Sequence, residues 1–141
     1  MFEPTRDQAR DFLFATWAKS RAGEALTPLE SQALAIVLEH PEYHPVLSDP
    51  ERYRDRTWTP EEGETNPFLH LALHLAIDEQ AAIDQPPGIR GILATLARRL
   101  DSEHTARHAA MECLAEVLWK AQRHGTGFDN EAYLDCLRRR L

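Results

Sequence analysis

The chain has 141 residues, a length typical of one compact domain, and its 43% hydrophobic and 28% charged residues exclude wholesale disorder. Sixteen basic and 23 acidic residues give a net charge of −7, which argues against nucleic acid or an acidic membrane surface as a partner. No apolar run approaches the roughly 18 residues that a membrane span needs, and the N-terminus does not resemble a signal peptide. We therefore expect a cytoplasmic protein with a single domain over residues 1–141.

Capping signals, apolar residues at helical spacing, and proline or glycine breakers divide the chain into helices. Thr5 with Gln8, and Thr27 with Glu30, each form a capping box. In chain order we predict helices over residues 5–22, 28–39, 67–84, 87–100, 102–124 and 130–140. Residues 41–47 are also compatible with a short additional helix that His40 would cap, which is not counted among the main helices. The predicted fold is all-α, a single helical bundle of five to six helices.

Residues 48–66 combine prolines, a glycine and many charged side chains without a clear period. We therefore expect one long charged surface loop there, which would act as a lid or contact a protein partner. Trp58 is the candidate partner contact within it. The sequence is also compatible with a homo-oligomer.

Six of the seven histidines form three pairs with the same four-residue spacing, namely His40 and His44, His70 and His74, and His104 and His108. On a helix this spacing places two imidazoles close enough to bind one metal ion. A carboxylate follows on the same stripe of two helices, Asp78 in one and Glu112 in the other. Repeated histidines followed by a carboxylate are ligands that non-haem iron and zinc use in helical bundles.

The two helical pairs lie on the apolar stripes of their helices, which predicts that both face inward. Short connections make neighbouring helices antiparallel, so all three pairs are expected at one end of the bundle. The pair at residues 40 and 44 carries the weakest signal, because Pro41 and Pro45 interrupt the helix that would give its spacing meaning.

These patterns favour a metal-binding bundle with His70, His74, His104 and His108 as primary ligands. Asp78 and Glu112 would add oxygen ligands, and His40 and His44 would complete or support the site. The metal would be non-haem iron or zinc. A nucleotide cofactor is not expected, because the chain has no glycine-rich phosphate loop.

Two other interpretations stay open. The histidines can form a hydrogen-bonded core network in a non-catalytic protein–protein interaction module, or a buried histidine and glutamate can perform acid–base catalysis without metal. The patterns do not decide whether the protein is an enzyme. Cys113 and Cys136 are too few for a disulfide framework or a thiolate cage, and we expect reduced thiols, with Cys113 facing away from the histidines.

Several longer phrases resemble one family. They are His40-Pro-Glu-Tyr-His44, Asn66-Pro-Phe-Leu-His70 with His74 and Glu79-Gln80, Asp84-Gln-Pro-Pro-Gly-Ile-Arg90, and Met111-Glu-Cys-Leu-Ala-Glu116. Together they resemble the bacterial domain-of-unknown-function 1841 family over essentially the whole chain. The resemblance implies a stand-alone soluble bacterial protein and assigns no activity or catalytic residue. The paired spacing alone is loosely similar to hemerythrin-like and DinB-like metal bundles, an analogy that does not fix function.

Overall fold

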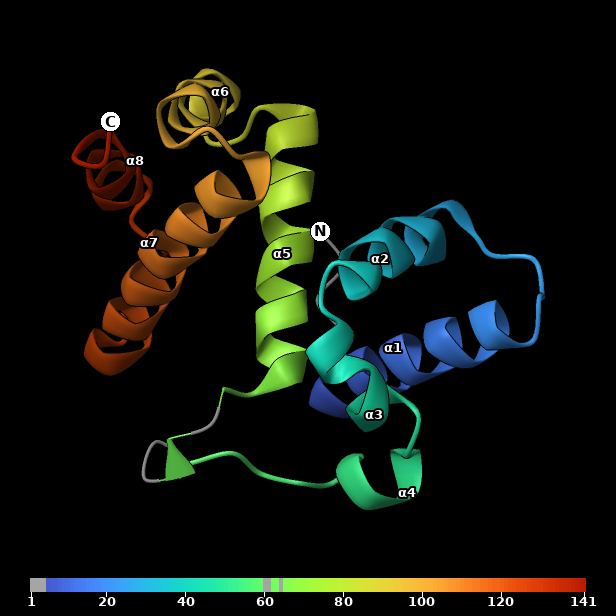
Figure 1. Cartoon of the computed structure of the whole chain (residues 1–141). Helices are drawn as coiled ribbons and strands as arrows, with labels where there is room; N and C mark the ends of the chain where they lie inside the picture. The colour runs from blue at the N-terminus through green and yellow to red at the C-terminus, as the bar shows by residue number, and fades with distance from the viewer. Residues whose placement is uncertain (1–4, 60–61, 64) are drawn as a thin grey trace. The chain divides into compact units, whose positions relative to one another are not determined.

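The computed structural model describes residues 5–59, 62, 63 and 65–141, and every regular element within them is helical (Figure 1). The α-helices are α1 (Arg6–Arg21), α2 (Pro28–Leu38), α3 (His44–Leu47), α4 (Pro50–Tyr53), α5 (Pro67–Ile83), α6 (Ile89–Leu100), α7 (Glu103–His124) and α8 (Asn130–Arg138), with a 3₁₀ turn over Pro41–Tyr43. The predicted all-α class is therefore confirmed for the described residues.

The predicted number of helices was too low. The described residues contain eight α-helices, whereas the sequence indicated five to six. The difference arises because the expected loop over residues 48–66 contains α4, and because the short helix expected over 41–47 is a 3₁₀ turn followed by α3. Asp49 explains α4, since its side chain accepts a hydrogen bond from the Arg52 backbone N–H at the start of that helix. Residues 60, 61 and 64 of the expected loop lie outside the described residues.

The chain divides into two compact units, and the boundary between Leu75 and Ala76 falls within α5. The expectation of a single domain is not tested by this division and stays a prediction. Among the helices of the described residues, none combines the length and the apolar composition that a bilayer crossing requires.

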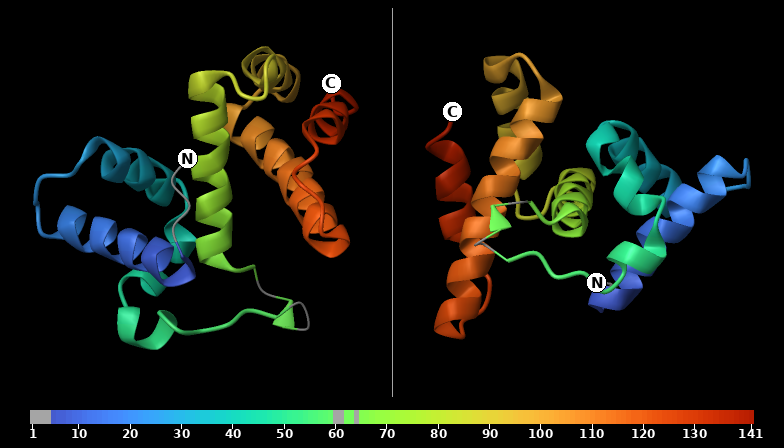
Figure 2. Two further views of the ribbon diagram at one scale, coloured as in Figure 1. Left: turned by 180° about the vertical axis from the view of Figure 1, so that it is seen from behind. Right: turned by 60° about the horizontal axis from the view of Figure 1, so that its bottom comes forward.

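The first unit is built around α1 and α2, which lie side by side (Figures 1 and 2). Both predicted capping boxes are present: Thr5 pairs with Gln8 at the start of α1, and Thr27 pairs with Glu30 at the start of α2. The buried core of this unit consists of Leu13, Phe14, Trp17, Ala33, Ile36, Val37, Leu47, Phe68 and Leu71.

A buried arginine fixes the segment after α4 against α1. The Arg10 side chain, in a residue only 3% exposed, donates hydrogen bonds to the carbonyls of Tyr53, Arg54 and Arg56 at 3.3, 2.8 and 2.7 Å. Its guanidinium carbon also lies 5.4 Å from the ring centroid of Trp58. The tryptophan expected to contact a partner is therefore partly buried against the core of its own unit.

In the second unit, α7 packs against both α6 and α8. The Tyr133 hydroxyl, on α8, donates a 2.6 Å hydrogen bond to Gln80 Oε1. Burial raises the pKa of Tyr133, so the hydroxyl keeps its proton at neutral pH. This contact joins α8 to the last turns of α5 within the unit.

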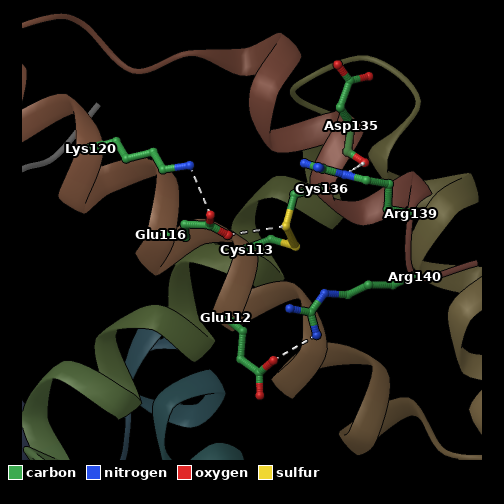
Figure 3. The surroundings of a disulfide bond; sticks show 8 residues. All are labelled: Glu112, Cys113, Glu116, Lys120, Asp135, Cys136, Arg139 and Arg140. Carbon is green, nitrogen blue, oxygen red and sulfur yellow. Dashed lines mark hydrogen bonds and ion pairs between the residues drawn. A yellow bond between two sulfur atoms is a disulfide. The ribbon is translucent and has the colours of Figure 1, made fainter.

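Cys113 on α7 and Cys136 on α8 form a disulfide, which corrects the expectation of reduced thiols (Figure 3). Their Cα atoms are 5.8 Å apart, although they are separated by 23 positions in sequence. Helix periodicity predicted only that Cys113 faces away from the histidines, and the structure shows that it is buried, with no exposed surface. It could not show which residue on another helix would face it, because that depends on how α7 and α8 pack.

Replacing Arg10 tests the anchor of the first unit. Arg10→Met keeps most of the side-chain volume but leaves three carbonyls without their charged donor. We expect the free energy of unfolding, measured by urea titration, to fall by about 2–3 kcal/mol. Arg6→Met is the matched control, because Arg6 also donates to carbonyls of this segment but is exposed. Equal losses in the two variants would contradict the assigned role.

Glu30 provides a test by pH. Its pKa is lowered from 4.5, first by a hydrogen bond from the Thr27 backbone and then by Lys19, whose Nζ lies 2.9 Å from Glu30 Oε2. A lowered carboxyl pKa gives stability that is present above the ordinary pKa and is lost as the pH falls through the lowered value. Glu30→Gln should therefore flatten the fall in melting temperature between roughly pH 5 and 3. Glu24→Gln, an exposed neighbour, should leave that slope unchanged.

Candidate metal centre

Three histidines of the first unit meet in one buried place. His40 and His74 are 2% and 1% exposed, and His70 is partly buried. Each offers a ring nitrogen within 4.8 Å of those of the other two. The ring centroids are 4.8 Å apart for His40 and His70, 4.7 Å for His40 and His74, and 5.0 Å for His70 and His74.

His70 and His74 are positioned by the start of α5. The Asn66 side chain accepts hydrogen bonds from the backbone N–H groups of Phe68 and Leu69, which begins the helix as predicted. The two histidines then occupy the first two turns, and their four-residue spacing turns both rings to the same side. The sequence prediction that this pair faces inward is in keeping with its burial.

His40 reaches the same place from the end of α2. It precedes Pro41, which disfavours helical backbone, and its φ and ψ of −127° and 65° take the chain out of the helix. The ring returns to the helix it has left, and Nδ1 lies 2.8 Å from the Ile36 carbonyl oxygen. The sequence predicted that His40 caps the helix that follows it, but its side chain makes no capping hydrogen bond to the 3₁₀ turn. The ring contacts the end of α2 instead.

The Ile36 contact determines where the His40 proton lies. A carbonyl oxygen can only accept, so Nδ1 carries hydrogen, and Nε2 of the neutral ring has a free electron pair. That Nε2 lies 3.1 Å from His70 Nε2. Without metal, His70 Nε2–H therefore donates a hydrogen bond to His40 Nε2. With metal, the Nε2 atoms of His40 and His70 can both direct electron pairs at the ion.

The distance between His40 Nε2 and His70 Nε2 is compatible with a hydrogen bond and with two nitrogens bound to one metal ion. Two nitrogens bound to zinc at about 2.0–2.1 Å with a tetrahedral angle lie about 3.3 Å apart. The 3.1 Å between the His40 and His70 nitrogens is near that value. Imidazole nitrogens are donors that zinc and iron accept. The arrangement can therefore hold a metal ion.

Tyr43 packs its aromatic ring against two histidines of the cluster. Its ring stacks on His40 at 5.5 Å with planes 4° apart, and meets the His70 ring edge-on at 5.6 Å. Burial raises the pKa of Tyr43, and the neighbouring carboxylate of Glu42 raises it further. The neutral phenol thus holds two rings of the cluster in orientation. Sequence spacing gave no sign of this residue, because its contact depends on the turn between α2 and α3.

His44 is directed elsewhere, although it belongs to the same sequence pair as His40. Its Nε2 lies 2.9 Å from the Val37 carbonyl oxygen, and its ring lies 4.3 Å from that of Trp17. His40 and His44 therefore contact successive carbonyls near the end of α2, where Ile36 and Val37 also accept from the backbone N–H groups of Glu39 and His40. The position of His40 just after the predicted end of the helix was the sequence signal for its contact with the end of α2.

The remaining predicted ligands lie in the second unit. His104 and His108 are both partly buried on α7, with ring centroids 4.1 Å apart. Asp78 forms an ion pair with Arg107 at 3.3 Å. Glu112 is exposed and pairs with Arg140 at 2.7 Å (Figure 3). Metal binding by these four residues, and by His44, stays a prediction.

Comparison with known proteins identifies the family. Residues 5–139 match the model of a family described as a domain of unknown function (DUF1841), and the chain belongs to that family. No curated protein and no solved structure matches the chain. The family description assigns no activity, so the function must be argued from the residues.

His40→Leu tests whether the ring supports the fold without metal. Leucine removes the ring contacts to the Ile36 carbonyl and to His70 Nε2, although the Ile36 carbonyl keeps the Glu39 backbone N–H. In the presence of a chelator we expect the free energy of unfolding to fall by about 1–3 kcal/mol. His124→Leu, at an exposed position on α7, is the control and should lie near the unsubstituted protein. A His40→Leu protein as stable as the control would refute the bridging role.

Proposed function

We propose that this protein binds a divalent transition metal, zinc or non-haem iron, through His40, His70 and His74. The observation that carries the proposal is the approach of the His40 and His70 Nε2 atoms to 3.1 Å, in a cluster whose His40 and His74 are buried. Backbone and aromatic contacts already orient the rings, so little side-chain freedom remains to be lost on binding.

The donor set limits the metal. Imidazole nitrogens suit zinc, iron, nickel and copper, whereas calcium and magnesium require oxygen ligands. The Nδ1–H···O=C bond from His40 to Ile36 is a typical outer contact of a metal-binding histidine, because it fixes the tautomer and makes Nε2 more basic. A metal held by these imidazoles would polarise a substrate or water bound to it.

Metal titration of untagged protein tests the proposal. After chelator treatment, the protein is titrated with Zn(II) and then with Co(II), whose visible spectrum reports coordination. We expect about one equivalent to bind, and His74→Gln to weaken Zn(II) binding by roughly a hundredfold or more, since it removes one of three ligands. The His40→Gln and His70→Gln proteins should behave in the same way.

Two matched controls make the titration specific. His124→Gln removes an exposed histidine, and His44→Gln removes one that contacts Val37 and Trp17. Both should keep the affinity of the unsubstituted protein. Binding below about 0.2 equivalents, or equal losses in the controls, would contradict the proposal and favour histidines that serve only the fold. Separate substitutions at His104 and His108 would test the sequence prediction that they too are ligands.

A further inference from the structure

The two cysteines of the disulfide in the second unit differ in solvent exposure. Cys113 is fully buried on α7, whereas Cys136 on α8 is 7% exposed. A pocket of about 250 Å³ lies beside it, between the later turns of α7, the following loop and α8. Cys136 lines this pocket and Cys113 does not. A molecule that enters the pocket therefore approaches the disulfide from the Cys136 side.

The charged lining of the pocket is balanced. Lys120 and Arg139 face Glu116 and Asp129, and Asp129 accepts from the Ala132 backbone N–H at 3.0 Å at the start of α8. The pocket therefore has room for a small polar molecule beside Cys136.

Glu116 is the acidic group next to the sulfur. Its Oε2 lies 3.8 Å from Cys136 Sγ, a contact rather than a hydrogen bond, because a disulfide sulfur carries no proton (Figure 3). Its Oε1 accepts a 3.0 Å hydrogen bond from Lys120 Nζ, which lowers the pKa of Glu116. At neutral pH the carboxylate therefore opposes an approaching thiolate, and Lys120 partly neutralises that charge.

We propose that Cys136 is a site of thiol–disulfide exchange with a low-molecular-weight thiol, and that Cys113 is the resolving thiol. The incoming thiolate attacks Cys136 Sγ and forms a mixed disulfide, while the bond to Cys113 breaks and Cys113 leaves as a thiolate that takes up a proton. In the reverse direction Cys113 attacks Cys136 Sγ, restores the internal disulfide and expels the small thiol.

Complete reduction consumes two small thiols. A second thiolate attacks the outer sulfur of the mixed disulfide, so that the small molecule leaves as its own disulfide and both cysteines are left as thiols. The two electrons come from the small thiol. The covalent link between α7 and α8 would then follow the thiol concentration of the compartment.

Single-cysteine variants test which sulfur is accessible. Cys113→Ser and Cys136→Ser both lose the disulfide, so they are matched, and each keeps one thiol. Treated with glutathione disulfide and followed by intact mass, Cys113→Ser should gain one glutathione roughly tenfold faster than Cys136→Ser. Equal rates, or the reverse order, would overturn the proposal.

The unsubstituted protein supplies a test that does not depend on the folding of those variants. It is incubated with reduced glutathione in the millimolar range and quenched with acid, and the adduct is located by peptide mass mapping. We expect glutathione on Cys136. An adduct mainly on Cys113, or a disulfide that glutathione does not attack, would refute the assignment.

Charge substitutions separate electrostatic control from loosened packing. Glu116→Gln should speed reduction by glutathione severalfold, because it removes a negative charge beside the sulfur, and Lys120→Gln should slow it. General destabilisation would speed both, since an opened structure exposes the bond. Changes in the same direction would therefore contradict the proposed role of the pocket charges.

Discussion

The first unit depends on one buried ring that is engaged at both of its nitrogens. His40 Nδ1 binds the Ile36 carbonyl at the end of α2, and His40 Nε2 meets His70 Nε2 near the start of α5. The Ile36 carbonyl already accepts from the Glu39 backbone N–H, so His40 is a second donor to it, and a ring at 2% exposure offers water little access. The two ring contacts tie His40 to the end of α2, fix its tautomer and place an electron pair inside the cluster.

The identical spacing of the histidine pairs has two structural meanings. Within α5 the four-residue spacing follows the helical turn, so His70 and His74 enter one cluster. Between His40 and His44 the chain passes through a 3₁₀ turn, so one ring enters the cluster and the other packs on Trp17. A spacing rule holds only where the backbone is a continuous α-helix, and Pro41 was the residue that marked the exception.

Local signals predicted the fold well, whereas contacts between helices were mostly beyond them. The capping boxes and the prolines placed the long helices to within about two residues at most ends, because caps act within a single turn. The sequence also named all three members of the cluster. It missed the packing of Trp58 on Arg10, the packing of Tyr43 on His40 and the partner of Cys113, since each depends on which side chains neighbouring helices present.

The space between His40 Nε2 and His70 Nε2 can hold either a hydrogen-bonding proton or a metal ion, but not both. Without metal, the proton on His70 Nε2 bridges to His40 over 3.1 Å. Metal binding requires that proton to leave or move to Nδ1, so the coordinate bonds must outweigh a hydrogen bond worth about 1 kcal/mol. Three neutral imidazoles supply no negative charge, and His70 lies at the positive end of α5. If a metal binds as proposed, both facts favour an additional anionic ligand.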